Sequence, residues 1–263
     1  MKEIFDDISE VAKIIWERGW AERNAGNISI DVSDKLGHIA RRSKSRKVKL
    51  AIKHPELAGR SFLVKATGSR FRDIAKCPEE NMLVARISDS LDGYDIICEP
   101  RGKDGMPTSE FPSHLSIHAY LRKSDPEKSA VLHTHPDHLI SLTHINQYST
   151  EPGLNRLLWS MHPEMKIVMP EGVGVAPYRV PGSDELADAT IRALGKRRLV
   201  LWEKHGCIAI GKDVFEAFDF IDTADKSARL FFIARNAGFE PEGLTDSQVD
   251  ELASIRSRKG RKS

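Results

Sequence analysis

The chain has 263 residues, a formal net charge of +2, and 40% hydrophobic and 30% charged residues. That balance is typical of a globular protein with a sizeable core, and the small net charge provides no global field for binding nucleic acid. No apolar stretch approaches the roughly 18 residues of a membrane-spanning helix. The acidic start MKEIFDDISE lacks the layout of a signal peptide, and three cysteines without CxxC spacing fit a reducing cytoplasm.

The first half of the chain predicts one helix followed by several strands. Residues 4–18 carry apolar side chains at a helical period, and Gly19 is suited to end that helix. The turn-rich AERNAGNISI leads into a predicted strand at 28–32, and further strands are expected at 61–68 and 94–99. The basic stretch RRSKSRKVK (41–49) is interpreted as a solvated loop or an insertion between strands rather than a phosphate-attracting patch.

In the second half, strands and helices alternate. A loop enters a helix near Pro112, AVLHTH forms a strand, and PDHLISLTHI begins a helix. Residues 166–180 resemble short strands broken by Pro and Gly, Ser183 is a favourable N-cap, and 199–211 predicts strand, turn, strand. A long helix from Val214 to about Asn236 follows. One apolar face of this helix is formed by Val214, Phe218, Ile221, Ala224, Ala228, Phe231 and Phe232.

No linker or internal repeat divides the chain. We therefore expect one α/β domain over residues 1–263, with helices on both faces of a sheet. The basic tail from about Arg256 is expected to be flexible.

Two histidines stand out in VLHTHPDHLI. Side chains at i and i+2 of a strand point the same way, so His133 and His135 face one spot, as a chelate requires. His205 lies at a turn between two apolar strands, a common position for a site. Three neutral imidazoles with an open position are typical of catalytic zinc, although HxH plus a distant His is a weak motif by itself.

Other candidate residues have competing interpretations. His114 and His118 lie four apart on a helix, a spacing that can bind metal, but the Glu of HExxH is missing. The turns NAGN (24–27) and TGS (67–69) either bind an anion through their backbone N–H groups or are simply turns. Glu110 in PTSEFP is either a capping charge at a helix start or a general base.

Several segments together resemble the class II aldolase/adducin family, in order from about residue 16 to residue 240. They are WAERNAGNIS, KATGSRFRDIA, PTSEFPSH, VLHTHPDHLISLTH, VMPEGVGVAPYRVPGSDELADAT, LVLWEKHGCIAIG and FIDTADKSA. WAERNAGN, PTSE and FIDTADKSA are particular to one branch of the family, whereas HxH and the glycine loops are shared more widely. Ala25 stands where a second Gly is usual, and residues 34–60 are hard to align.

The resemblance implies a single α/β/α domain around a mainly antiparallel sheet, assembled as a tetramer with sites at subunit interfaces. It implies a metal-dependent lyase that cleaves a sugar phosphate, with one Zn²⁺ per subunit. The small net charge and the lack of a membrane-spanning stretch predict no nucleic-acid or membrane partner, and the cysteines predict a cytoplasmic protein. The implied metal ligands are His133, His135 and His205, and Glu110 is the implied catalytic acid/base. The implied phosphate-binding or site-lining residues are Asn24, Gly26, Asn27, Ser69, Thr108 and Ser109, and Glu164 matches a second carboxylate.

The chemistry agrees with this resemblance. Cleaving a ketose 1-phosphate leaves a negatively charged enediolate, and a three-histidine zinc keeps room for both of its oxygens. Relatives of the same fold act on other substrates, such as L-fuculose 1-phosphate or pentulose phosphates, and adducin-type members are scaffolds that have lost the metal ligands. A class I aldolase is a further alternative, with the desolvated Lys65 as its Schiff-base lysine.

Overall fold

The computed structural model describes residues 1–36, 46–50, 52, 54–102 and 104–259. Within these residues one sheet of nine strands has the order β2-β5-β4-β3-β1-β6-β9-β8-β7. The strands are β1 (Asn27–Asp31), β2 (Arg46–Lys49), β3 (Ser61–Lys65), β4 (Met82–Ile87), β5 (Gly93–Cys98), β6 (Ala130–Thr134), β7 (Gly174–Ala176), β8 (Leu199–Trp202) and β9 (Gly206–Gly211). Only β7 and β8 pair in parallel, so the predicted mainly antiparallel sheet is confirmed.

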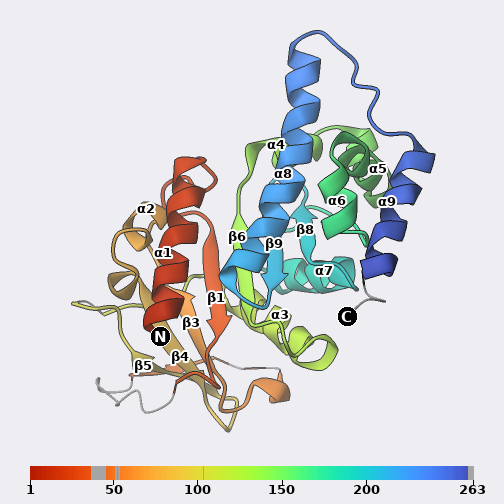
Figure 1. The fold of residues 1–263 in the computed structure, drawn as a ribbon. Helices are drawn as coiled ribbons and strands as arrows, with labels where there is room; N and C mark the ends of the chain where they lie inside the picture. Colours follow the sequence, from red (N-terminus) through yellow and green to blue (C-terminus); the bar gives the residue numbers. More distant parts are fainter. Residues whose placement is uncertain (37–45, 51, 53, 103, 260–263) are drawn as a thin grey trace.

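Helices cover both faces of the sheet (Figure 1). They are α1 (Lys2–Glu17), α2 (Phe71–Ile74), α3 (Phe111–Ser124), α4 (Asp137–Leu142), α5 (Glu151–Met161), α6 (Pro163–Val168), α7 (Asp184–Leu194), α8 (Val214–Asn236) and α9 (Asp246–Lys259). Helices α1 and α8 contact each other on one face, and α3 and α7 pack together on the other. The predicted three-layer α/β/α arrangement is therefore confirmed.

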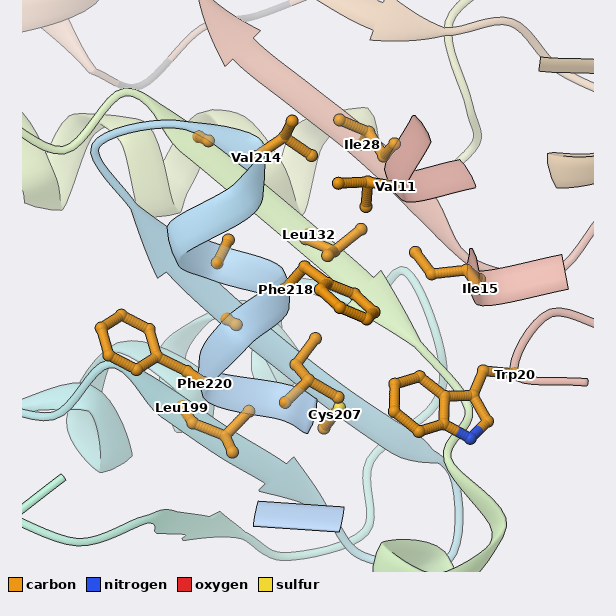
Figure 2. Close-up of a cluster of buried hydrophobic side chains, with 14 of the residues drawn as sticks. Val11, Ile15, Trp20, Ile28, Leu132, Leu199, Cys207, Val214, Phe218 and Phe220 are labelled. Carbon is orange, nitrogen blue, oxygen red and sulfur yellow. The ribbon is translucent and has the colours of Figure 1, made fainter. Parts of the chain in front are cut away.

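The largest buried cluster lies between the sheet and the α1–α8 face (Figure 2). Val11 of α1 and Phe218 of α8 meet Ile28 of β1 and Leu132 of β6 there. Alternate residues of the same strands, such as Val131, turn to the opposite face and pack under α3 and α7. The predicted apolar face of α8 is buried except for Phe232, which is half-buried.

Two local predictions are wrong. Residues 166–168 end the helix α6 instead of forming a strand, and only Gly174–Ala176 of the 166–180 stretch is β. Pro163 in the first turn and Glu164 beside it favour a helix start, which explains the difference. Arg46–Lys49 form the edge strand β2 rather than a loop. The remainder of the basic stretch lies outside the described residues.

The C-terminal helix α9 is described through Lys259. The predicted flexibility of the basic tail beyond Arg256 stays a prediction, since residues 260–263 lie outside the described part. Among the helices that the structure describes, none combines the length and the apolar character needed to cross a bilayer.

Candidate metal centre

Strand pairing brings the three predicted histidines together. His133 lies in β6 and His135 directly follows it, and β6 pairs with β9 so that Thr134 is opposite Cys207. The tight turn between β8 and β9 thereby places His205 beside the HxH pair. The three ring centroids are 4.9, 5.0 and 5.1 Å apart. One ligand atom from each histidine lies within 4.8 Å of the others, and no other such group of three or more occurs among the described residues.

The hydrogen bonds of the HxH pair turn two nitrogen lone pairs toward each other. His133 Nδ1 donates to the carbonyl of Cys207 at 2.8 Å, and His135 Nδ1 donates to the carboxylate of Glu22 at 3.0 Å. Both acceptors lack a proton to give, so each Nε2 keeps its lone pair. The two Nε2 atoms are 3.1 Å apart. Nitrogens bound to a tetrahedral zinc at 2.0–2.1 Å lie about 3.3 Å apart, so this donor set fits a metal.

Burial keeps His133 and His205 in the neutral form that a metal requires. The pKa of His133 is held well below its usual value, first by burial and then by the nearby His135 and His205 rings. Burial, with a smaller contribution from His135, lowers the pKa of His205 to about 4. These imidazoles are therefore unprotonated at neutral pH and are available as ligands.

Two residues that sequence reasoning missed support the triad. Glu22, from the WAERN segment, fixes the tautomer and ring orientation of His135, an outer contact common to metal-bound histidines. Gly206 leaves room for the rings: a Cβ there would lie 2.6 Å from the Thr134 carbonyl oxygen and 2.7 Å from His135 Cδ2. The EKHG turn therefore needs a glycine next to the third histidine.

Glu110 lies beside the triad, at the N-terminal end of α3. It occupies the N-cap position of α3, and its side chain makes no capping hydrogen bond, so both the capping-charge and the general-base roles stay predictions at this point. One carboxylate oxygen, Oε2, accepts a hydrogen bond from Asn27 Nδ2 at 2.7 Å and lies 3.9 Å from His133 Nε2. The Glu110 side chain is 13% exposed and therefore lies largely buried next to His133, one of the three histidines of the triad.

The NAGN loop (24–27) lies next to the end of β6 that carries His133. Asn27 is paired across β1 and β6 with His133. Gly26 has φ +66°, and a Cβ there would lie 2.8 Å from the His133 carbonyl oxygen, so only glycine fits this approach. The exposed Asn24 offers its carbonyl to Lys65 Nζ at 2.6 Å. The predicted anion-binding turn is thus adjacent to the histidine site.

The TGS turn (67–69) and the PTSE segment (107–110) are hydrogen-bonded to each other's surroundings next to the end of β3. Thr67 donates from its N–H to the Met106 carbonyl at 2.7 Å, and Thr108 N–H donates to the Lys65 carbonyl at 3.0 Å. Ser69 is buried, and its hydroxyl has no hydrogen-bond partner among the described residues. Ser109 is exposed. A buried hydroxyl without a partner is unfavourable unless a ligand or water supplies one.

Glu164 is not brought to the triad within this chain. It lies on α6, where its carboxylate is 3.1 Å from His162 Nε2. Both residues line a separate cavity of about 360 Å³, which Arg18 and Asp222 also border. No described contact joins Glu164 to the histidine site, so its place near the substrate stays a prediction.

The chain belongs to the family described as Class II Aldolase and Adducin N-terminal domain, which residues 6–232 match. Two relatives are named rhamnulose-1-phosphate aldolase. That of Bacteroides thetaiotaomicron is 42% identical over 255 residues, covering 96% of this chain and 93% of the relative. That of Listeria monocytogenes serotype 4b (strain F2365) is 34% identical over 258 residues, covering 95% and 94%.

Solved structures agree with this placement. The crystal structure of a sugar-phosphate aldolase from Thermotoga maritima has a TM-score of 0.79 at 33% identity, covering 92% of this chain and 99% of that one. An L-fuculose 1-phosphate aldolase has a TM-score of 0.64 at 20% identity, covering 98% and 97%, and shows a common fold alone. The predicted family is confirmed, and the chain is a lyase. Class II aldolases depend on a metal, and the histidine triad is able to bind one.

Proposed function

We propose that this chain is a zinc-dependent aldolase that reversibly cleaves L-rhamnulose 1-phosphate to dihydroxyacetone phosphate and L-lactaldehyde. The observation that carries the proposal is the convergence of the histidine nitrogens beside the Glu110 carboxylate, 3.9 Å from His133 Nε2. The choice of sugar rests on the names of the relatives and on the WAERNAGN, PTSE and FIDTADKSA segments.

His133, His135 and His205 would hold one Zn²⁺ per subunit. When bound, the metal would supply Lewis acidity to the carbonyl and hydroxyl oxygens of the substrate. The choice of zinc rests on three neutral imidazoles, which suit zinc and leave a coordination position open for a substrate. The contact from Glu22 to His135 supports this role, because it orients the ring toward the other two.

Glu110 would be the acid/base of the reaction. In the direction of synthesis its carboxylate removes a proton from carbon three of dihydroxyacetone phosphate, and in the direction of cleavage it returns that proton. Asn27 holds one carboxylate oxygen through its side-chain N–H, which leaves the other oxygen free to take the proton. A base positioned in this way is typically worth about 10² to 10⁴ in rate.

The loops around the site would bind the phosphate. Gly26 and Asn27 supply backbone N–H groups from the NAGN turn, and Ser69 supplies a buried hydroxyl without a partner among the described residues. Asn24, Thr108 and Ser109 would add donors or line the site. These groups are mainly neutral, and they suit a dianion that is bound close to a metal.

Assembly as a tetramer in the cytoplasm completes the proposal. Tyr178 and Val180 are 57% and 64% exposed in the single chain. The same loop passes the site, because a Cβ on Gly182 would lie 3.9 Å from Glu110 Cγ. Exposed apolar side chains beside the site support a subunit interface there. Glu164 would act as a second carboxylate only if a neighbouring subunit brings it to the site.

The test is a comparison of ketose 1-phosphates. We expect release of dihydroxyacetone phosphate from L-rhamnulose 1-phosphate, its loss with EDTA and its return with Zn²⁺. L-fuculose 1-phosphate gives the same products and differs in one hydroxyl configuration. One hydrogen bond of about 1–3 kcal/mol should therefore favour the rhamnulose ester in kcat/KM by roughly 5- to 150-fold.

Two results would overturn parts of the proposal. Equal kcat/KM values, or a preference for the fuculose ester, would reject the substrate but leave the metal aldolase intact. Activity that resists EDTA, together with a borohydride-trapped adduct on Lys65, would reject the metal mechanism in favour of a Schiff base.

A further inference from the structure

A row of buried polar side chains leads away from Glu110 between α3 and β1. Ser29 Oγ is 2.7 Å from His114 Nδ1 and 2.8 Å from His118 Nε2. His114 Nε2 is hydrogen-bonded to Asn27 Oδ1, and Asn27 Nδ2 donates to Glu110 Oε2 at 2.7 Å. The four side chains behind Glu110 are at most 4% exposed. One unbroken path of hydrogen bonds therefore joins His118 to the carboxylate.

The carboxylate fixes the direction of every bond in this path. An ionised Glu110 only accepts, so Asn27 must present its NH₂ to Glu110 and its carbonyl oxygen to His114. His114 must then carry its proton on Nε2, which leaves Nδ1 to accept from the Ser29 hydroxyl. The Ser29 oxygen accepts in turn from His118 Nε2–H. With these directions, each hydrogen bond of the path has one donor and one acceptor.

We propose that His118, Ser29 and His114 are positioning residues that hold Asn27, and through it the Glu110 carboxylate, in the orientation required for proton transfer. The inference rests on the proposed function for the reaction that Glu110 serves. It also assigns a role to His114 and His118 other than the metal pair that their spacing allows, because their facing nitrogens are already bonded to Ser29.

The side-chain amide explains why such a chain is needed. The two ends of the Asn27 amide are similar in size, so packing alone does not decide which one faces Glu110. A flipped amide would place its oxygen against the carboxylate and repel it. The Nε2–H of His114 prevents this flip, since it accepts no hydrogen bond from an NH₂ group.

The neutral state of both histidines is consistent with this arrangement. Burial is the main reason that the pKa of His114 and that of His118 are each lowered to about 3. Neither ring therefore gains a second N–H at neutral pH, and the pattern of donors and acceptors is preserved. Leaving these buried groups unpaired would be costly, so all members must keep their partners together.

The first test reads the tautomers directly. In long-range ¹H–¹⁵N spectra of the zinc-loaded protein with ¹⁵N-labelled histidine, His114 and His118 should both be neutral and protonated on Nε2. His133 should be protonated on Nδ1, which provides an internal contrast. A His114 protonated on Nδ1, or on both nitrogens, would overturn the proposal without reference to catalysis.

The second test breaks the middle of the chain with Ser29→Ala. We expect zinc content and the KM for dihydroxyacetone phosphate to be unchanged. The rate of carbon-three proton exchange should fall by about tenfold or more, but by less than the 10² to 10⁴ expected for the base itself. The matched control is Ile117→Ala, which also removes buried volume from α3 but lies outside the chain.

The comparison separates positioning from stability. If Ile117→Ala lowers the denaturation midpoint at least as much as Ser29→Ala and keeps its exchange rate, the loss in Ser29→Ala is a positioning effect. Equal exchange rates in the two variants would overturn the proposal. An inactive wild-type protein would instead reject the proposed function, while the tautomer pattern would still test the hydrogen-bond chain.

Discussion

Lys65 carries a buried positive charge at the end of β3, and replacing it with methionine is expected to stabilise the protein. Its side chain is 2% exposed, and Nζ donates to the Asn24 carbonyl at 2.6 Å. Burial lowers the pKa of Lys65 from 10.5 to about 8, although the nearby Glu110 charge opposes this shift. The folded protein therefore bears a cost for keeping this group charged at neutral pH.

The size of that cost follows from the pKa shift. At about 1.4 kcal/mol per pKa unit, a shift from 10.5 to about 8 corresponds to about 3 kcal/mol near pH 7. Losing the hydrogen bond to Asn24 would cost about 1 kcal/mol. Lys65→Met should therefore raise the free energy of unfolding by about 2 kcal/mol. A methionine has nearly the same length and suits a buried position.

The cost of the Lys65 charge to the free energy of unfolding should fall as the pH rises. Between the folded pKa of about 8 and the unfolded value of 10.5, the unfolded chain holds a proton that the folded protein has released. The stability of the wild type therefore rises with pH in this window, and the cost of Lys65 should shrink to about 1 kcal/mol near pH 9.5. Below pH 8 the full cost is present.

Urea denaturation of both proteins at pH 7 and pH 9.5, at one protein concentration, measures this difference. Lys47→Met serves as the control, because Lys47 is exposed and paired with Asp92. A Lys65→Met variant that was less stable than the wild type at pH 7 would show that the buried charge carries no such cost. A gain in stability that was the same at both pH values would contradict the predicted pH dependence.

Three further predictions concern the metal centre. Glu22→Gln should weaken zinc binding by about 10- to 100-fold in a chelator competition, because an amide orients His135 less strongly than a carboxylate. An unchanged zinc affinity would show that Glu22 does not support the metal site. Gly206→Ala should lose about 1–3 kcal/mol of stability and also release zinc. The control is Gly174→Ala, which should lose stability but keep its zinc, because its Cβ would lie 2.3 Å from the Ala193 carbonyl oxygen, away from the site. His205→Ala should remain folded and lose its zinc by elemental analysis; full zinc content would show that the third ligand is misassigned.

Short-range patterns predicted much of the fold. The alternation of side chains along a strand placed His133 and His135 on one side, and Ser183 caps α7 as expected by accepting from Leu186 N–H at 3.2 Å. Both depend on neighbours within a few residues, which the sequence shows directly. At 166–168 the local pattern predicts a strand, but the helix that begins at Pro163 continues through Val168.

The contacts that complete the site are long-range and could not be predicted in this way. Glu22 and His135 are 113 residues apart, and Asn27 and Glu110 are 83 residues apart. Their proximity follows from the pairing of β1 with β6 and the packing of α3, which no local pattern encodes. For the same reason the local sequence allows Glu110 to be either a capping charge or a base, and only the fold shows that its carboxylate lies beside His133.

The most direct test of the account is the exchange of the carbon-three proton of dihydroxyacetone phosphate with deuterated water, measured for the wild type and Glu110→Gln at matched zinc content. Glutamine keeps the shape of the side chain but cannot carry the proton. We predict exchange by the wild type and a loss of about 10² to 10⁴ in the variant with zinc retained. Exchange at the wild-type rate in the variant would contradict the central claim that Glu110 moves this proton beside the histidine-bound metal.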